Sequence, residues 1–173
     1  PKPSRSAPAA GRLTDTELRH LAASNPEAAI RRLEQEPDLS AERQLMLARL
    51  LAGRNRLQQA RQTVEQLITK QPLNAEAHYL LGIIARESKD VQTALNSLRR
   101  AGFLDHEFAL ARVTLAGVLA DQGQTRRAQG ELRSAAQLLE GKSPTDAVTG
   151  DPDLNVGRLR EQIDAQLKLL GVP

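Results

Sequence analysis

The stretch AEAHYLLGIIARESKDVQTALNSLRRAGFLDHEF, residues 75–108, decides the fold because its pattern recurs at a fixed interval. When the sequence is shifted by 34 residues in either direction, small and apolar residues coincide without an insertion or a deletion. The coinciding sets are Leu47-Ala48, Leu81-Gly82 and Leu115-Ala116; Leu51, Ala85 and Leu119; Ala60, Ala94 and Ala128; Val64, Leu98 and Leu132; and Leu67, Ala101 and Ala135. A period of this length is typical of helical hairpins stacked in a row, so the sequence predicts an all-α fold.

Each copy of the repeat is expected to form two helices. Apolar residues spaced three and four apart predict helices over 41–53, 57–70, 75–87, 91–102, 108–121 and 125–139. The repeated alanines and glycine are expected to lie where two helices cross, because a larger side chain would push the helix axes beyond roughly 8–10 Å. Residues 38–140 are therefore assigned three repeats, at 41–74, 75–108 and 109–140.

The segments outside the repeats differ from them in composition. Residues 1–12 hold three prolines within eight residues and are interpreted as a Pro/Ala-rich linker. Residues 13–37 are expected to form an atypical helical hairpin, because a capping box and the Asn25-Pro26 pair mark two helix starts. Residues 141–155, with two prolines, two glycines and three aspartates, are predicted to be a loop. Residues 156–170 are predicted to form a capping helix at the open end of the array.

The composition narrows the classes of function. The 173 residues include no cysteine, which excludes disulfides, thiolate catalysis and cysteine zinc sites. The net charge is +3, but arginine pairs stand among acids on the predicted helix faces, which disfavours nucleic-acid binding. No apolar run approaches the length of a membrane span. We expect a cytoplasmic protein without membrane insertion and, because the chain begins with Pro1, interpret it as a fragment of a longer protein.

No catalytic, cofactor-binding or metal-binding residues are predicted. The three histidines, His20, His78 and His106, are far apart in sequence, and none has a second ligand at metal spacing. Asp151 and Asp153 lack the glycine and glutamate positions of a calcium loop. No phosphate-binding loop is present either. The fragment is therefore expected not to be an enzyme.

The best candidate for a functional surface is the inner face of the predicted array, where the first helix of each hairpin lies. Helical spacing predicts that the following residues face outward there and form a largely apolar partner-binding groove: Leu45, Met46, Arg49, Tyr79, Leu80, Ile83, Arg86, Leu110, Val113, Thr114, Gly117 and Asp121. In the alternative interpretation, some of these residues contact the neighbouring hairpin or the N-terminal pair of helices.

The repeat resembles the tetratricopeptide repeat. The resemblance is best in residues 75–108, in the Leu81-Gly82 pair, Ala94, Leu98 and Ala101, although His78 stands at the usual tryptophan position. The resemblance implies a right-handed superhelix of antiparallel helical hairpins that binds a protein or a peptide segment.

A narrower resemblance comes from the combination of a Pro/Ala-rich linker, three repeats, the TGDPDL sequence at 149–154 and the GRLRE sequence at 157–161. The combination is similar to the C-terminal region of CheR-type chemotaxis methyltransferases that carry tetratricopeptide repeats. That resemblance implies a catalytic domain before residue 1, which would transfer a methyl group from S-adenosylmethionine to receptor glutamates.

The fragment itself would bind no cofactor and would direct or restrict receptor methylation. Its partner would be the cytoplasmic region of a receptor, a signalling protein or the catalytic domain of its own parent protein. In the alternative interpretation, the chain is a generic tetratricopeptide scaffold in a secretion or pilus complex.

Overall fold

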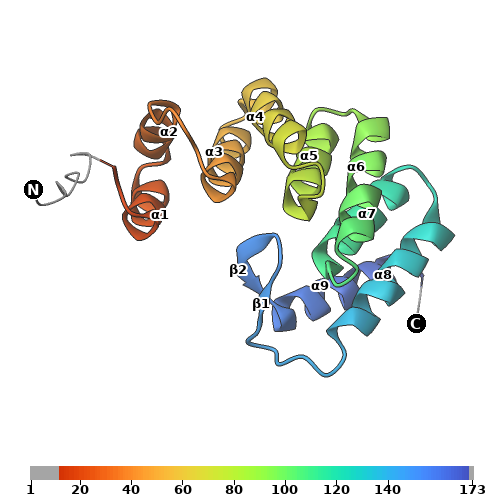
Figure 1. The fold of residues 1–173 in the computed structure, drawn as a ribbon. Coiled ribbons are helices and arrows are strands. Elements are labelled where there is room, and N and C mark those ends of the chain that lie inside the picture. Colours follow the sequence, from red (N-terminus) through yellow and green to blue (C-terminus); the bar gives the residue numbers. More distant parts are fainter. Residues whose placement is uncertain (1–11, 172–173) are drawn as a thin grey trace, which may run out of the picture. The chain divides into compact units, whose positions relative to one another are not determined.

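The computed structural model describes residues 12–171, so the predicted linker lies, except for Arg12, outside the described residues. The chain divides into two compact units, of which the first ends at Leu39 and the second begins at Ser40. Over the described residues it forms nine helices and one two-stranded sheet (Figure 1). None of these helices is long and apolar enough to cross a membrane.

The first unit is a pair of helices, α1 (Asp15–Ser24) and α2 (Pro26–Glu34). The predicted capping box begins α1, because the backbone N–H of Thr14 donates to Glu17 Oε2 at 2.8 Å and the Thr14 hydroxyl oxygen accepts from Glu17 N. The side chain of Asn25 caps α2, and Pro26 occupies its first turn. Both predicted helix starts of the N-terminal hairpin are therefore confirmed.

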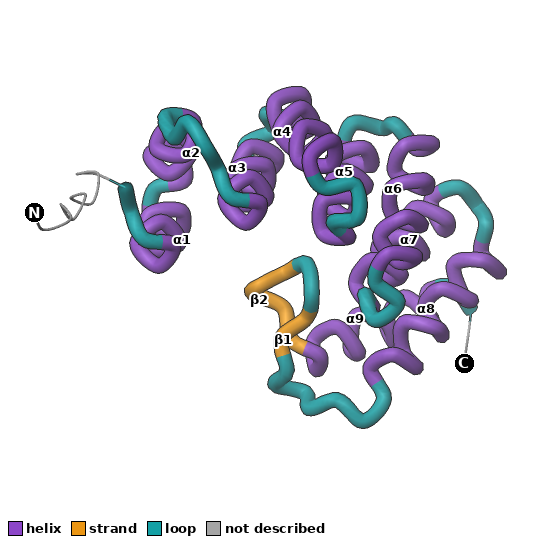
Figure 2. The backbone as a smooth tube through the Cα atoms, viewed as in Figure 1, coloured by secondary structure: helices purple, strands orange, loops and turns teal. Residues whose placement is uncertain are grey.

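The second unit contains three helical hairpins. They are α3 (Ala41–Gly53) with α4 (Leu57–Lys70), α5 (Ala75–Glu87) with α6 (Val91–Leu104), and α7 (Ala109–Asp121) with α8 (Thr125–Leu139) (Figure 2). Each helix begins and ends within two residues of its predicted bounds.

The turn inside each hairpin repeats with the same period. Asn55, Lys89 and Gly123 stand 34 residues apart, and each has a positive φ, of 59°, 63° and 71°. Asn and Gly adopt this left-handed conformation readily, whereas Lys adopts it at a cost. The turns therefore repeat in backbone conformation as well as in spacing. This holds even at Lys89, although lysine does not favour a positive φ.

The repeated small residues lie at the helix crossings, as predicted. Ala48, Ala60, Ala94 and Ala128 are completely buried. A Cβ added to Gly82 would stand 2.6 Å from Leu98 Cγ, closer than carbon atoms approach without displacement. The close approach of α5 to α6 therefore depends on glycine at position 82. The predicted all-α array of antiparallel hairpins is confirmed.

The segment predicted to be a loop contains a small antiparallel ribbon. Strands β1 (Ala147–Val148) and β2 (Asp151–Asn155) pair through Ala147 with Asn155 and through Val148 with Asp151. Strands this short show no periodicity, and the glycine, proline and aspartate residues in and between them favour turns, so the ribbon could not be recognised from the sequence. Tertiary contacts fix the ribbon, as Val148 is buried in the core of the second unit.

The last helix, α9 (Val156–Leu169), covers the end of the array beside α8 (Figure 2). Leu159 and Ile163 on its apolar side are buried. The guanidinium of Arg160 donates to the carbonyl oxygens of Leu139 and Lys142, and the side-chain amide of Gln129 donates to Leu170 O at 2.9 Å. These contacts satisfy carbonyl groups at the C-terminal ends of both helices and hold α9 on α8.

Candidate functional site

The inner face of the second unit is built from α3, α5 and α7, the first helices of the three hairpins. Ion pairs join each of these helices to the next. Arg49 Nη2 lies 2.9 Å from Glu76 Oε2, and Arg86 Nη2 lies 3.2 Å from Asp121 Oδ2. All four side chains are at least one-third exposed, so each pair contributes about 1 kcal/mol or less to stability. Both predicted groove arginines are therefore paired with an acid of the next repeat.

The structure divides the twelve predicted groove residues into two groups. Five are buried and do not face solvent: Leu45, Tyr79, Leu80, Leu110 and Val113. Seven are at least partly exposed: Met46, Arg49, Ile83, Arg86, Thr114, Gly117 and Asp121. The expectation that all twelve face outward is therefore wrong for the five buried residues. Partner binding at the exposed ones stays a prediction.

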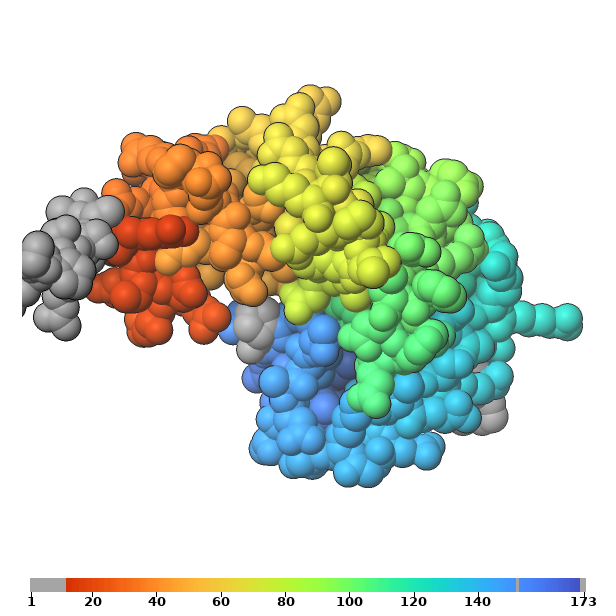
Figure 3. Space-filling view, viewed as in Figure 1, coloured from red at the N-terminus to blue at the C-terminus, as the bar shows by residue number. Residues whose placement is uncertain are grey.

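A segment of the chain itself covers part of the inner face. The β1–β2 ribbon lies in the hollow of the array, where its surface adjoins that of α5 (Figures 1 and 3). Arg49 Nη2 donates a hydrogen bond to the carbonyl oxygen of Gly150 at 3.3 Å. Gly150 packs against Phe108 and Tyr79, whose ring centroids are 4.9 Å apart. Tyr79 is thus an internal contact of the chain and not an accessible groove residue.

Phe108 occupies a position that has a different role in the other two repeats. Ser40 and Asn74, which precede it at intervals of 34 residues, cap α3 and α5 with their side chains. Phe108 precedes α7 and makes no such hydrogen bond, but its ring is fully buried beneath the ribbon. In the third repeat this position therefore does not cap a helix, and its side chain contacts the C-terminal segment instead.

The environment of Tyr79 alters the acidity of its hydroxyl. Burial raises the pKa of Tyr79 above its ordinary value of 10.0, because the phenolate would lose solvation. Hydrogen bonding with Thr114 and the charge of Arg49 lower this pKa, while the charge of Asp151 raises it further. Tyr79 therefore remains neutral under physiological conditions.

The titratable residues of the described part do not gather into a metal site. No group of three or more His, Cys, Asp or Glu among residues 12–171 could hold a metal ion. Asp151 Oδ1 accepts a hydrogen bond from Asp153 N at 2.9 Å, which closes a local turn. The ring of His78 contacts the carbonyl oxygen of Pro72 through Nε2 at 2.9 Å.

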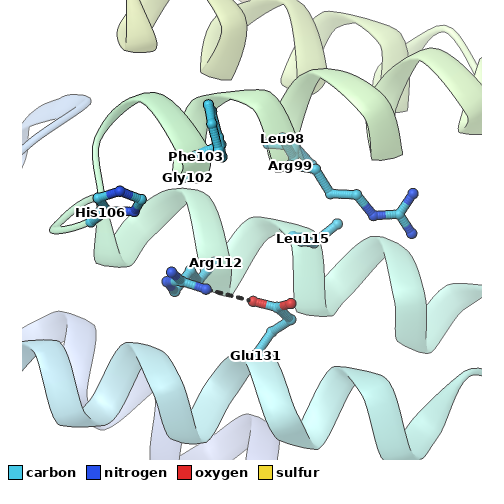
Figure 4. A pocket seen from close by; sticks show the side chains of 8 residues that line it. All are labelled: Leu98, Arg99, Gly102, Phe103, His106, Arg112, Leu115 and Glu131. Carbon is cyan, nitrogen blue, oxygen red and sulfur yellow. Dashed lines mark hydrogen bonds and ion pairs between the residues drawn. The ribbon is translucent and has the colours of Figure 1, made fainter.

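A second surface feature was not predicted from the sequence. A hollow of about 270 Å³ lies between α6, α7 and α8, and we call it the α6–α8 pocket (Figure 4). Its lining residues are Leu98, Arg99, Gly102, Phe103, His106, Arg112, Leu115 and Glu131. The sequence held one signal for this pocket, because Phe103 is aromatic whereas Thr69 and Gln137, the residues 34 positions before and after it, are polar. The Phe103 side chain is 65% exposed in the structure.

With this geometry established, comparison with known proteins identifies the repeats. Residues 45–103 match the family model described as Tetratricopeptide repeat. Residues 45–103 are tetratricopeptide repeats. Modules of this kind bind proteins or peptides and stack side by side as these hairpins do.

One relative is named as a probable methyltransferase. The chain is 35% identical over 97 residues to the probable biofilm formation methyltransferase WspC of Pseudomonas putida (strain KT2440). The match covers 53% of this chain and 21% of the relative, so the chain spans about a fifth of the length of WspC.

Two solved structures share the fold. MamA superimposes with a TM-score of 0.68 at 19% identity, over 93% of this chain and 88% of MamA. The type III secretion chaperone SycD of Yersinia enterocolitica, solved with a peptide of the translocator YopD, superimposes with a TM-score of 0.65 at 15% identity. That match covers 76% of this chain and 92% of SycD. At these identities the likeness concerns the fold alone.

Proposed function

We propose that this chain is the partner-binding module of a receptor methyltransferase and directs or restricts the methylation of receptor glutamates. The observation that carries the proposal is the 35% identity to a methyltransferase over 97 residues. The module contributes binding, while a catalytic domain outside this chain transfers the methyl group from S-adenosylmethionine to a glutamate carboxylate in the cytoplasm.

No residue of this chain is assigned to S-adenosylmethionine. The methyl donor belongs, in this proposal, to the catalytic domain.

The inner face supports a binding role through the residues that the ribbon leaves accessible. Met46 and Ile83 offer apolar surface, and the Arg86–Asp121 pair offers charge of both signs beside it. Gly117 lies beside this ion pair, since a Cβ on residue 117 would be in ordinary van der Waals contact with the Arg86 guanidinium, at 3.6 Å. A receptor segment of mixed polarity fits this surface.

The likeness to SycD concerns the fold and favours neither the secretion nor the pilus alternative. A deletion test separates the proposed role from that of a scaffold. Residues 13–170 are removed from the full-length protein, and methylated receptor glutamates are mapped by mass spectrometry with S-adenosylmethionine as donor. We expect an altered site pattern or an altered rate of methylation. An unchanged pattern together with an unchanged rate would contradict the proposal.

Point variants of the full-length protein test the surface. Met46→Ala combined with Arg86→Glu alters only partly or fully exposed side chains and should shift methylation in the same direction as the deletion. Arg158→Glu, on the exposed side of α9, is the matched charge control and should leave methylation unchanged. If the double variant methylates receptors as the wild type does, the inner face is not the surface that binds the receptor.

A further inference from the structure

The α6–α8 pocket has an apolar floor and open space above it. Leu98 and Leu115 form the floor and are 1% and 5% exposed. A Cβ added to Gly102 would meet no atom within 4 Å, so the space beside this glycine is empty. The volume of about 270 Å³ is below the range of roughly 300–1,000 Å³ that is typical of pockets for drug-sized ligands. One or two side chains of a peptide fit it better.

The rim of the pocket carries an ordered but exposed aromatic ring. Phe103 is one of three aromatic residues in the chain other than histidine, and the other two, Tyr79 and Phe108, are buried. Arg100 Cζ lies 5.6 Å from the Phe103 ring centroid, and the His106 ring meets it edge-on at 6.2 Å. An exposed aromatic ring beside a shallow apolar hollow is typical of the anchoring groups of protein interfaces.

The helices that form the pocket also hold much of the positive charge. Helices α6, α7 and α8 contain six arginines and two acidic residues, whereas the whole chain has a net charge of +3. Both acids are paired, Asp121 with Arg86 of α5 and Glu131 with Arg112. Helix α6 holds Arg99 and Arg100 and no acid. The loop between α6 and α7 adds two acids, Asp105 and Glu107, of which Glu107 pairs with Lys142. The positive potential is therefore confined to the α6 side of the pocket, at Arg99 and Arg100, and favours a negatively charged partner there.

We propose that the α6–α8 pocket binds an acidic protein segment. One apolar side chain of the segment fills the space over Gly102, between Leu98 and Leu115. Flanking glutamates or aspartates of the segment lie beside Arg99 and Arg100 on the rim. This site is separate from the inner face, because Arg112 and Leu115 face a different side of α7 from the predicted groove residues.

One feature favours a protein segment over a nucleic acid. Phe103 is a single exposed ring, whereas single-stranded nucleic acids are bound by successive stacking platforms.

The test uses the 173-residue chain and an array of synthetic peptides. Each peptide holds one Leu, Ile, Phe or Trp flanked by up to four glutamates in a Gly/Ser background. In the control series, glutamines or lysines replace the glutamates. We expect binding to increase with the number of glutamates and to weaken with added salt, since the contacts are charge-assisted. Equal binding of the glutamine series, or no binding in the array, would overturn the proposal.

Three variants locate the binding. Arg99→Glu reverses the charge and Phe103→Ala removes the ring, and each should weaken binding about tenfold or more. Gly102→Leu fills the empty space without changing a charge and should block the apolar side chain. Arg158→Glu and Leu73→Ala change a comparably exposed arginine and an apolar residue that is 72% exposed, and they should bind as the wild type does.

Thermal unfolding of each variant checks that the array remains folded, which is expected because all three positions border open space. Retained binding by folded Gly102→Leu and Phe103→Ala would overturn the proposal. It would also be overturned if amide chemical-shift changes on peptide binding appeared on α3 and α5, or if single-stranded RNA or anionic lipid vesicles bound at this pocket more tightly than the acidic peptides. The outcome does not depend on whether the inner face binds a receptor.

Discussion

Gly150 lies against Phe108 so closely that a Cβ on residue 150 would stand 2.7 Å from two atoms of the Phe108 ring. The φ of Gly150 is +94°, a conformation that residues with a side chain rarely adopt. Glycine is thus required at this position for two independent reasons, backbone conformation and close contact. This single residue determines whether the ribbon can rest on the inner face.

The Gly150→Ala variant should be destabilised by about 1–3 kcal/mol, from the strained φ and from displacement of Phe108. Gly141→Ala is the matched control, because Gly141 has a φ of +74° but an added Cβ there meets no atom within 4 Å. Urea unfolding of both variants separates the two causes. The Gly150 variant should lose more stability than the control, and equal losses would show that the Phe108 contact is unimportant.

The acidity of Tyr79 reports on the ribbon directly, because Tyr79 is the single tyrosine of a chain without tryptophan. Phenolate absorbance should titrate above pH 10.0 in the folded chain and return to about 10 in guanidinium chloride. A raised pKa in the folded state means that the contribution of neutral Tyr79 to stability is present below the unfolded pKa. It is lost as the pH rises through the folded pKa.

In the Gly150→Ala variant, a displaced ribbon would expose Tyr79 and bring its titration back toward the ordinary value. Asp151→Asn removes a negative charge that raises the same pKa and should lower it without moving the ribbon. An unshifted titration in both variants would mean that the ribbon does not cover Tyr79.

The parts of the fold that repeat were predictable from the sequence, and the parts that depend on a distant segment were not. Small residues such as Gly82 and Ala94 predicted the crossings, because close helix packing constrains residue size directly. The ribbon depends on Phe108 and Tyr79 lying beneath Gly150, and no local pattern of residues 141–155 encodes that contact. The available sequence signal of that contact was Phe108, which stands where the other two repeats have a helix-capping residue.

The same distinction holds for the candidate sites. Helical spacing placed Arg86 and Asp121 on one face, where they form an ion pair, but it cannot show which residues of that face another segment covers. Tyr79 and Val113 were consequently assigned to an open groove although they are buried. The α6–α8 pocket could not be predicted from the recurring residues, because Phe103 stands where the other repeats have polar residues.

Asp90 joins two hairpins and should make stability sensitive to acid. Its carboxylate accepts a hydrogen bond from Thr93 N at 3.1 Å, and Arg61 Nη1 lies 3.0 Å from its Oδ2. Hydrogen bonding to Thr93, followed by Arg61, lowers the pKa of Asp90 below its ordinary value of 3.8. The resulting stabilisation is present above the unfolded pKa and is lost as the pH falls through the folded one.

Asp90→Asn keeps an N-cap side chain but cannot titrate. Melting temperatures measured from neutral pH to below pH 3.8 should fall less steeply for this variant than for the wild type. Asp153→Asn serves as the control, because Asp153 is exposed. Identical acid profiles of the wild type and Asp90→Asn would exclude a role for Asp90 in the acid response.

Gly82 is the position at which the repeat itself can be tested. Gly82→Leu should destabilise the chain by about 1–3 kcal/mol, because the new side chain must displace Leu98 at the α5–α6 crossing. Gly130→Leu provides the opposite case, since an added Cβ at Gly130 in α8 meets no atom within 4 Å. Replacing glycine within an open helix face should raise stability by about 0.5–1 kcal/mol. Chemical denaturation of the two variants should therefore give shifts of opposite sign, and a neutral Gly82→Leu variant would mean that α5 and α6 do not depend on this contact.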